Sequence, residues 1–143
     1  ASSTARNGRA FMPPQQDGSH PDASPPTASM AEPQPLSVQE LQHRLLQGDD
    51  LLVIDVREDS ELALASLSHP VLHLPLSRAA DWLESLTSQV PPQQPLAVLC
   101  HAGVRSWQFG CWLLDERGYT AVFNVEGGID AWSRLVDPSV PRY

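Results

Sequence analysis

The chain has 143 residues, a length that fits one domain. Its nine arginines and seventeen acidic residues, with no lysine, give a net charge of −8 at pH 7, which argues against direct nucleic-acid binding because that requires a basic face. Two cysteines are too few for a disulfide framework, and no apolar run approaches the roughly 18–20 residues of a membrane helix.

Residues 1–35 differ in composition from the rest of the chain. They contain seven of the fourteen prolines and almost no large apolar side chains. Such a segment cannot bury enough surface to offset the entropy lost on ordering. We therefore expect residues 1–35 to be disordered and a single domain to span residues 36–143. The first dozen residues lack acidic side chains, a faint sign of a transit peptide, but an upstream extension is the better interpretation.

The domain begins with a helix, a strand and a second helix. Ser37 and Glu40 have the spacing of a capping box, and an apolar stripe over residues 38–46 predicts a helix. Residues 51–54 are a short apolar run typical of a buried strand, and residues 58–66 have the acidic first turn of a short helix.

The same alternation continues to the end of the chain. The sequence predicts a strand over residues 71–74, a helix over 77–86, a strand over 96–99, a helix from 106 to Gly118, a strand over 121–125, a helix over 129–135 and an extended tail over 137–143.

Short buried strands that alternate with helices predict an α/β domain. We expect a central, mainly parallel sheet of four to five strands with helices on both faces. In such sheets ligands bind beyond the carboxyl ends of the strands. Asp55, Cys100 and the Gly127-Gly128 turn all follow predicted strands, so they should gather at one edge of the sheet.

Cys100 is the candidate nucleophile. It ends a predicted strand and precedes a short loop, residues 101–105, which contains Ala102 and Gly103 and opens a helix. The backbone N–H groups of such a loop form a cradle for negative charge, and Arg105 adds a fixed positive charge. This setting favours the thiolate, which is the nucleophilic form. A lone cysteine at a strand end is more often only a core residue, and the loop shifts the balance toward function.

Three separated motifs resemble those of the rhodanese (thiosulfate sulfurtransferase) family and occur in the family's order. They are residues 52–57, residues 100–106 and residues 124–132. The resemblance covers about residues 36–143, and the chain is similar to small single-domain rhodaneses. The loop from Cys100 to Arg105 has six residues, as in rhodaneses, whereas related cysteine phosphatases have one residue more to fit a phosphate.

The resemblance implies a rhodanese-like fold and a sulfurtransferase that uses no cofactor and no metal. Sulfane sulfur from thiosulfate or a related donor would pass through a persulfide on the cysteine to a thiol or cyanide acceptor. The loop arginine either attracts the anionic donor or braces the loop through a carboxylate, and both roles stay open. The implied residues are Cys100 as nucleophile, His101, Ala102, Gly103, Val104 and Arg105 as the substrate-binding loop, and Asp55, Arg57 and Ser106 as supports.

Two other functions stay open beside this enzyme. One is a sulfur-relay or binding module that passes persulfide sulfur between protein partners, such as a sulfur-carrier protein. The other is a phosphatase or arsenate reductase of the same fold, which the loop length disfavours. We further expect a monomer with no membrane contact, located in the cytoplasm, or in an organelle matrix if the N-terminal segment is a transit peptide.

Packing is the expected role of several other residues. Trp107 lies one turn from the loop, and packing in the core is favoured over lining the mouth of the site. Trp132 is predicted to pack in the core, and His73 is predicted to be a satisfied core or edge residue. Cys111 follows Cys100 by about three helical turns, so packing is favoured over a resolving-thiol role.

Overall fold

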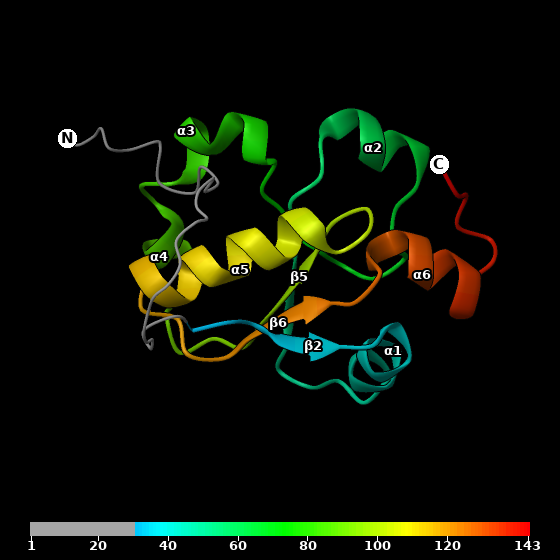
Figure 1. The fold of residues 1–143 in the computed structure, drawn as a ribbon, viewed down its shortest axis with the longest axis horizontal. Helices are drawn as coiled ribbons and strands as arrows, with labels where there is room; N and C mark the ends of the chain where they lie inside the picture. Colours follow the sequence, from blue (N-terminus) through cyan, green and yellow to red (C-terminus); the bar gives the residue numbers. More distant parts are fainter. Residues whose placement is uncertain (1–30) are drawn as a thin grey trace, which may run out of the picture.

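Five short strands form one parallel sheet at the centre of the molecule (Figure 1), which the computed structural model describes over residues 31–143. The strand order is β2-β6-β5-β3-β4, and every neighbouring pair is parallel. The strands are β2 (Gln34–Leu36), β3 (Leu52–Asp55), β4 (Leu72–His73), β5 (Leu96–Leu99) and β6 (Val122–Val125). The predicted fold class is therefore confirmed.

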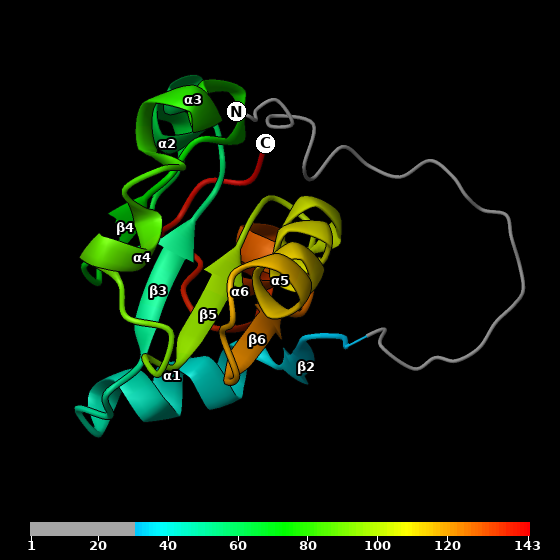
Figure 2. The same cartoon turned by 90° about the vertical axis from the view of Figure 1, so that its left-hand side faces the viewer.

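Helices cover both faces of this sheet, as Figures 1 and 2 allow the reader to follow. The helices are α1 (Val38–Leu46), α2 (Asp59–Leu64), the 3₁₀ turn η3 (Leu76–Arg78), α3 (Ala79–Trp82), α4 (Leu86–Gln89), α5 (Val104–Glu116) and α6 (Gly128–Leu135). One core cluster contains side chains of α1 and α6, and the other contains side chains of α3, α4 and α5.

The position of β5 at the centre of the sheet explains why its sequence is a continuous apolar run. All four of its residues are buried. Ala97 and Leu99 belong to the core cluster with α1 and α6, while Leu96 and Val98 belong to the cluster on the other face. A strand that is buried on both faces has no solvent side to carry polar residues.

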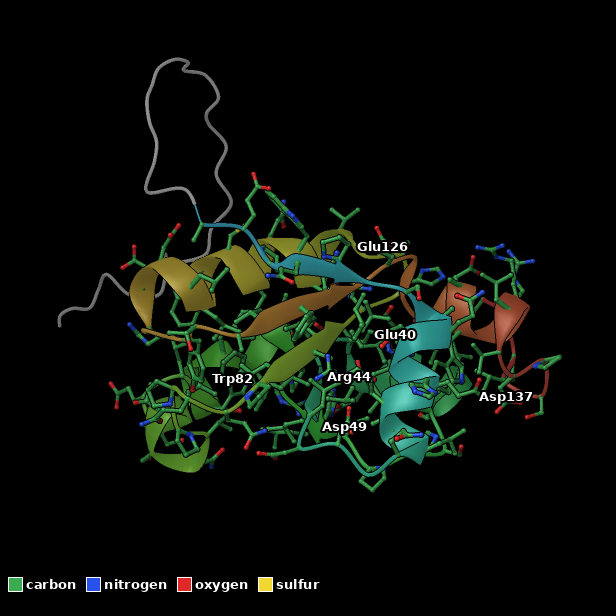
Figure 3. The ribbon with its side chains drawn as sticks, turned by 90° about the horizontal axis from the view of Figure 1, so that it is seen from below. Glu40, Arg44, Asp49, Trp82, Glu126 and Asp137 are labelled. Carbon is green, nitrogen blue, oxygen red and sulfur yellow. The ribbon has the colours of Figure 1, made fainter. Side chains whose placement is uncertain are left out.

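The first helix follows the sequence prediction. Ser37 caps α1, and its hydroxyl oxygen accepts a hydrogen bond from the Glu40 N–H at 3.1 Å. At the other end of the helix, Arg44 pairs with Asp49 at 3.2 Å; both residues are labelled in Figure 3.

The folded part begins earlier than the sequence indicated. Residues 1–30 of the segment expected to be disordered lie outside the described residues, but Gln34 and Pro35 belong to β2, which pairs with β6. The prolines misled the prediction. An edge strand tolerates proline because one side of its backbone needs no partner, and burial of Leu36 fixes the strand to the core.

Three other predictions need correction. The single helix expected over residues 77–86 is broken into η3, α3 and α4, and the Ser85 hydroxyl donates to the Trp82 carbonyl at the break. The strand expected over residues 71–74 has only the two residues of β4. The tail over residues 137–143 contains a turn, because Val140 N donates to the Asp137 carbonyl.

Candidate active site

Cys100 lies directly after β5, where the chain turns into the loop that opens α5 (yellow-green in Figure 1). Its side chain is nearly inaccessible, with 1% exposure for the residue. The sulfur accepts hydrogen bonds from Gly103 N at 3.1 Å and from Ser106 N at 3.4 Å. Gly103 has a φ of +103°, a conformation that favours glycine, and it lies where the chain turns from the loop into α5. Backbone N–H groups therefore converge on Sγ, as predicted for an anion cradle.

The N-terminus of α6 holds the opposite side of this loop. Ile129 N donates to the Cys100 carbonyl at 2.9 Å, and Asp130 N donates to the His101 carbonyl at 3.1 Å. A Cβ atom at Gly128 would lie 2.4 Å from both carbonyl oxygens, so only glycine allows this close approach. With their carbonyls bound to α6, the loop residues are free to aim N–H groups at the sulfur.

A polar chain lies beneath the sulfur. The Ser106 hydroxyl is 3.2 Å from Cys100 Sγ and donates to Asn124 Oδ1, while Asn124 Nδ2 donates to the Gly103 carbonyl at 3.1 Å. Ser106 is fully buried, so its hydroxyl has no water as an alternative partner. The sequence analysis did not single out Asn124, although a polar residue within the buried strand β6 is a signal that could have identified it.

Arg105 forms a bidentate ion pair with Glu61 of α2. Its two terminal nitrogens lie 2.8 and 2.9 Å from the two carboxylate oxygens. Hydrogen bonding from Arg105 outweighs the opposing effect of burial and lowers the pKa of Glu61 from 4.5 to about 2. Of the two roles left open for Arg105, this ion pair fits the brace, because it ties the start of α5 to α2. Sequence reasoning noticed Glu61 only as an acidic residue in the first turn of its helix.

A second arginine–carboxylate pair lies at the end of β3. Arg57 Nη2 is 2.8 Å from Asp55 Oδ2, and the Arg57 backbone N–H also donates to this carboxylate. Arg57 is fully buried, and its remaining Nη1 group donates to the Glu61 carbonyl and to the Tyr143 hydroxyl. A buried ion pair is tolerated when all its donors are satisfied. The pair therefore fits the supporting role predicted for it.

His101 and Tyr143 form the remaining contact around the loop. Their rings are stacked, with centroids 4.2 Å apart and planes inclined by 14°. The Tyr143 hydroxyl also donates to Glu61 Oε2 at 3.0 Å. Tyr143 had no predicted role, and no local pattern in the sequence points from residue 143 to residue 101.

The other loop residues and nearby side chains differ in exposure. Ala102 and Val104 are exposed, and Val104 reaches 66%. Trp107 is 40% exposed, so the prediction that it packs in the core is wrong. Trp107 lies one helical turn after Val104, and the two leave an apolar surface beside the loop.

The remaining packing predictions are supported. Trp132 is buried in the core, and His73 Nε2 is hydrogen-bonded to the Arg57 carbonyl at the edge strand β4. Cys111 is a free thiol, and burial, with nearby Asp115 and Glu32, raises its pKa to about 11. A thiol held in its protonated form is a poor resolving nucleophile.

No group of three or more His, Cys, Asp or Glu residues able to hold a metal ion occurs within residues 31–143. Across the same part of the chain, every helix is too short or too polar to cross a membrane.

Comparison with known families identifies a model that matches most of the chain. The model of the rhodanese-like domain matches residues 37–135. Among solved structures, a rhodanese-like domain from Anabaena superposes with a TM-score of 0.61 at 21% identity, over 74% of this chain and 76% of that one. A rhodanese-like domain protein from Staphylococcus aureus gives 0.59 at 24% identity, over 77% of this chain and 98% of that one. These two likenesses establish the fold.

Curated relatives fall into large and small proteins. A chloroplastic rhodanese-like/PpiC domain-containing protein of Arabidopsis thaliana is 41% identical over 66% of this chain, which spans only 31% of that relative. A sulfurtransferase of Allochromatium vinosum is 33% identical over 66% of this chain and 82% of the relative. A putative sulfurtransferase of Bacillus subtilis is 32% identical over 72% and 93%. The relatives matched over most of their own length support sulfur transfer of the rhodanese type as the general class.

Proposed function

The chain belongs to the rhodanese-like domain family, and from this premise we propose that it is a sulfurtransferase that carries sulfane sulfur as a persulfide on Cys100. The observation that carries the proposal is the convergence of Gly103 N, Ser106 N and the Ser106 hydroxyl on a single sulfur atom. Fixed donors of this kind stabilise an anion at one point, much as an oxyanion hole does.

The proposed reaction has two displacement steps. In the first, the Cys100 thiolate attacks the outer sulfur of thiosulfate, the S–S bond of the donor breaks, and sulfite leaves with the bonding electron pair. In the second, an acceptor thiolate or cyanide attacks the terminal sulfur of the persulfide and releases the Cys100 thiolate. The backbone donors hold the negative charge on sulfur in each state.

The two nearby arginines act as supports in this proposal. Arg105 is occupied by Glu61 and Arg57 by Asp55, so neither offers a free charge to the donor. Donor binding then depends on the N–H groups of residues 101–105. Ser106 has a single hydroxyl proton, which Asn124 accepts in the structure and for which a Cys100 thiolate competes.

A relay between protein partners is the alternative, and one observation favours it. Val104 and Trp107 leave an exposed apolar surface beside the loop, which suits a protein partner. Among the relatives, a protein of Zea mays is named adenylyltransferase and sulfurtransferase; it is 32% identical over 85% of this chain, which spans 26% of that relative. In this alternative the acceptor is a protein thiol or a sulfur-carrier protein, and thiosulfate is a poor donor.

The compartment, the oligomeric state and the cofactor requirement that we propose follow from the same chemistry. Both cysteines are free thiols, which fits a reducing compartment such as the cytoplasm. A monomer suffices, because every residue of the proposed site comes from one chain, and the displacement steps need no cofactor or metal.

Intact mass spectrometry after incubation with thiosulfate tests the proposal. We expect the wild-type protein to gain one sulfur and release sulfite, and a Cys100→Ser variant to do neither. Cyanide should then remove the added sulfur as thiocyanate. If thiosulfate fails but a protein persulfide donor loads Cys100, the relay is the function. If both donors fail, sulfur transfer is refuted, and hydrolysis of an aryl phosphate that depends on Cys100 would establish the phosphatase instead.

A further inference from the structure

The tail after α6 folds back onto the candidate site. Figures 1 and 2 show it in red, running from α6 to the vicinity of α2. Two contacts fix its course: the Ser133 hydroxyl donates to the Val140 carbonyl, and Arg142 pairs with Asp130 at 2.9 Å. Val140 is also buried in the core. The tail is therefore a folded element that delivers Tyr143 to a defined place.

Tyr143 contacts three separate parts of the site. Its ring stacks on His101 of the loop, its hydroxyl accepts from Arg57 at the end of β3, and the same hydroxyl donates to Glu61, the partner of Arg105. The two hydrogen bonds hold the hydroxyl end of the phenol in place, so the ring that stacks on His101 is a supported platform. Such bonds to charged partners are stronger than bonds between neutral groups.

The platform acts on the residue that directly follows the nucleophile. The backbone of His101 is already fixed, because its carbonyl accepts from Asp130 N. Its side-chain torsions are the freedom that remains, and stacking on Tyr143 selects one arrangement of the ring. The chosen arrangement keeps the imidazole against Tyr143, within the loop whose N–H groups face the buried Cys100 sulfur.

We infer that Tyr143 is a positioning residue of this site, which fixes the His101 ring in one place within the loop that would bind a small sulfur donor. The inference rests on the proposed function for the identity of the donor. The contact itself and its effect on access to the thiol do not depend on it.

Steady-state assays with thiosulfate and cyanide test the inference in two variants. Tyr143→Leu removes the ring, and we expect KM for thiosulfate to rise about two- to tenfold with kcat unchanged, the size of effect expected for one aromatic pair. Tyr143→Phe keeps the ring and loses only the hydroxyl, so its KM should lie closer to the wild-type value than that of Tyr143→Leu. A purely structural role would reduce the active fraction, and therefore kcat, without changing KM.

Two controls separate an effect that passes through His101 from a general loosening of the fold. Phe123→Leu removes a half-buried ring that packs near Arg44 instead of His101, and it should leave KM unchanged. In a His101→Ala background, Tyr143→Leu should have no further effect on KM. If Tyr143→Leu leaves KM unchanged, or raises it equally with and without His101, the inference is overturned.

Alkylation of Cys100 by iodoacetamide keeps the test independent of sulfur chemistry. Cys100 is only 1% exposed while the two rings are stacked. We therefore expect Tyr143→Leu to speed modification of the Cys100 peptide at least twofold, and Tyr143→Phe to speed it less. If the wild-type protein takes no sulfur from thiosulfate, thiosulfate is not its donor. The alkylation rates then still test whether Tyr143 positions His101. Equal rates in the wild type and both variants would overturn it.

Discussion

At the scale of single residues, the charges around Cys100 are arranged in closed pairs. Arg105 is matched by Glu61, and Arg57 by Asp55. A cationic side chain that is held by a carboxylate contributes orientation more than net charge. The donors that remain for an anionic sulfur are the backbone N–H groups of Gly103 and Ser106, which occupy fixed positions, and the Ser106 hydroxyl, whose proton is now donated to Asn124.

The first prediction concerns the pairing of Glu61 with Arg105. Glu61→Gln should lower the free energy of unfolding at pH 7 by about 1–3 kcal/mol, in the lower part of this range because Arg105 is one-third exposed. The pKa of Glu61 falls from 4.5 to about 2 on folding. The native state thus gains stability from the carboxylate above pH 4.5, and this gain disappears as the pH falls through about 2.

Urea unfolding of the wild type and Glu61→Gln at several pH values measures this linkage. The difference in free energy of unfolding between the two proteins should be constant above pH 4.5 and shrink steadily at lower pH. Glu40→Gln is a matched control at an exposed position of α1, and it should show a much smaller difference at every pH. A Glu61→Gln difference that does not change with pH would contradict the assigned ion pair.

Residue-level prediction from sequence succeeded where partners are close in the chain. Asp55 and Arg57 are two positions apart, so their pairing is local and their motif is visible. Glu61 and Arg105 are 44 positions apart, and Arg57 and Tyr143 are 86 apart. Such pairs depend on how α2 and the tail pack, which leaves no periodic signal in the sequence. This is why Glu61, as the partner of Arg105, and the stacked tyrosine were missed.

At the scale of elements, the N-terminus of α6 supports the loop that follows Cys100, and Gly128 makes this close approach possible. The second prediction is that Gly128→Ala lowers the free energy of unfolding by about 1–3 kcal/mol or more, because the new Cβ would overlap the carbonyl oxygens of Cys100 and His101. The φ of Gly128 is also positive, at +59°. We expect the loop to shift and persulfide formation to be lost.

Gly48→Ala is the matched control for this substitution. Gly48 has a similar positive φ of +74°, but a Cβ there would meet nothing within 4 Å. It should therefore cost only the backbone strain, about 1–2 kcal/mol, and leave sulfur loading intact. Equal stability and equal loading in the two variants, measured by urea unfolding and intact mass, would show that Gly128 is not needed for close approach to the loop.

The helices and strands differed in how well the sequence predicted them. β5 was predicted at its observed residues because burial on both faces produces an uninterrupted apolar run. α3 and α4 were merged into one helix because the apolar spacing of Leu83 and Leu86 continues through the break. The local bond from the Ser85 hydroxyl to the Trp82 carbonyl, which marks the break, does not alter that spacing. β2 escaped notice because only Leu36 among its residues is buried.

At the scale of the whole molecule, the net charge of −8 opposes the approach of an anionic donor. The arginines nearest to Cys100 cannot offset this repulsion, because both are neutralised by carboxylates. The electrostatic field that an approaching donor meets is then set by the acidic surface, and added salt screens this field. Salt shortens the Debye length from about 30 Å at 0.01 M to about 8 Å at 0.15 M.

The third prediction is that salt accelerates loading. The second-order rate of sulfite release from thiosulfate should rise severalfold between low and physiological ionic strength, because the donor is a dianion that the acidic protein repels. Alkylation of Cys100 by neutral iodoacetamide provides the control, and its rate should stay constant over the same range. A thiosulfate rate that falls with added salt would mean that local positive potential steers the donor, and the two ion-paired arginines would then have to contribute net charge to the site after all.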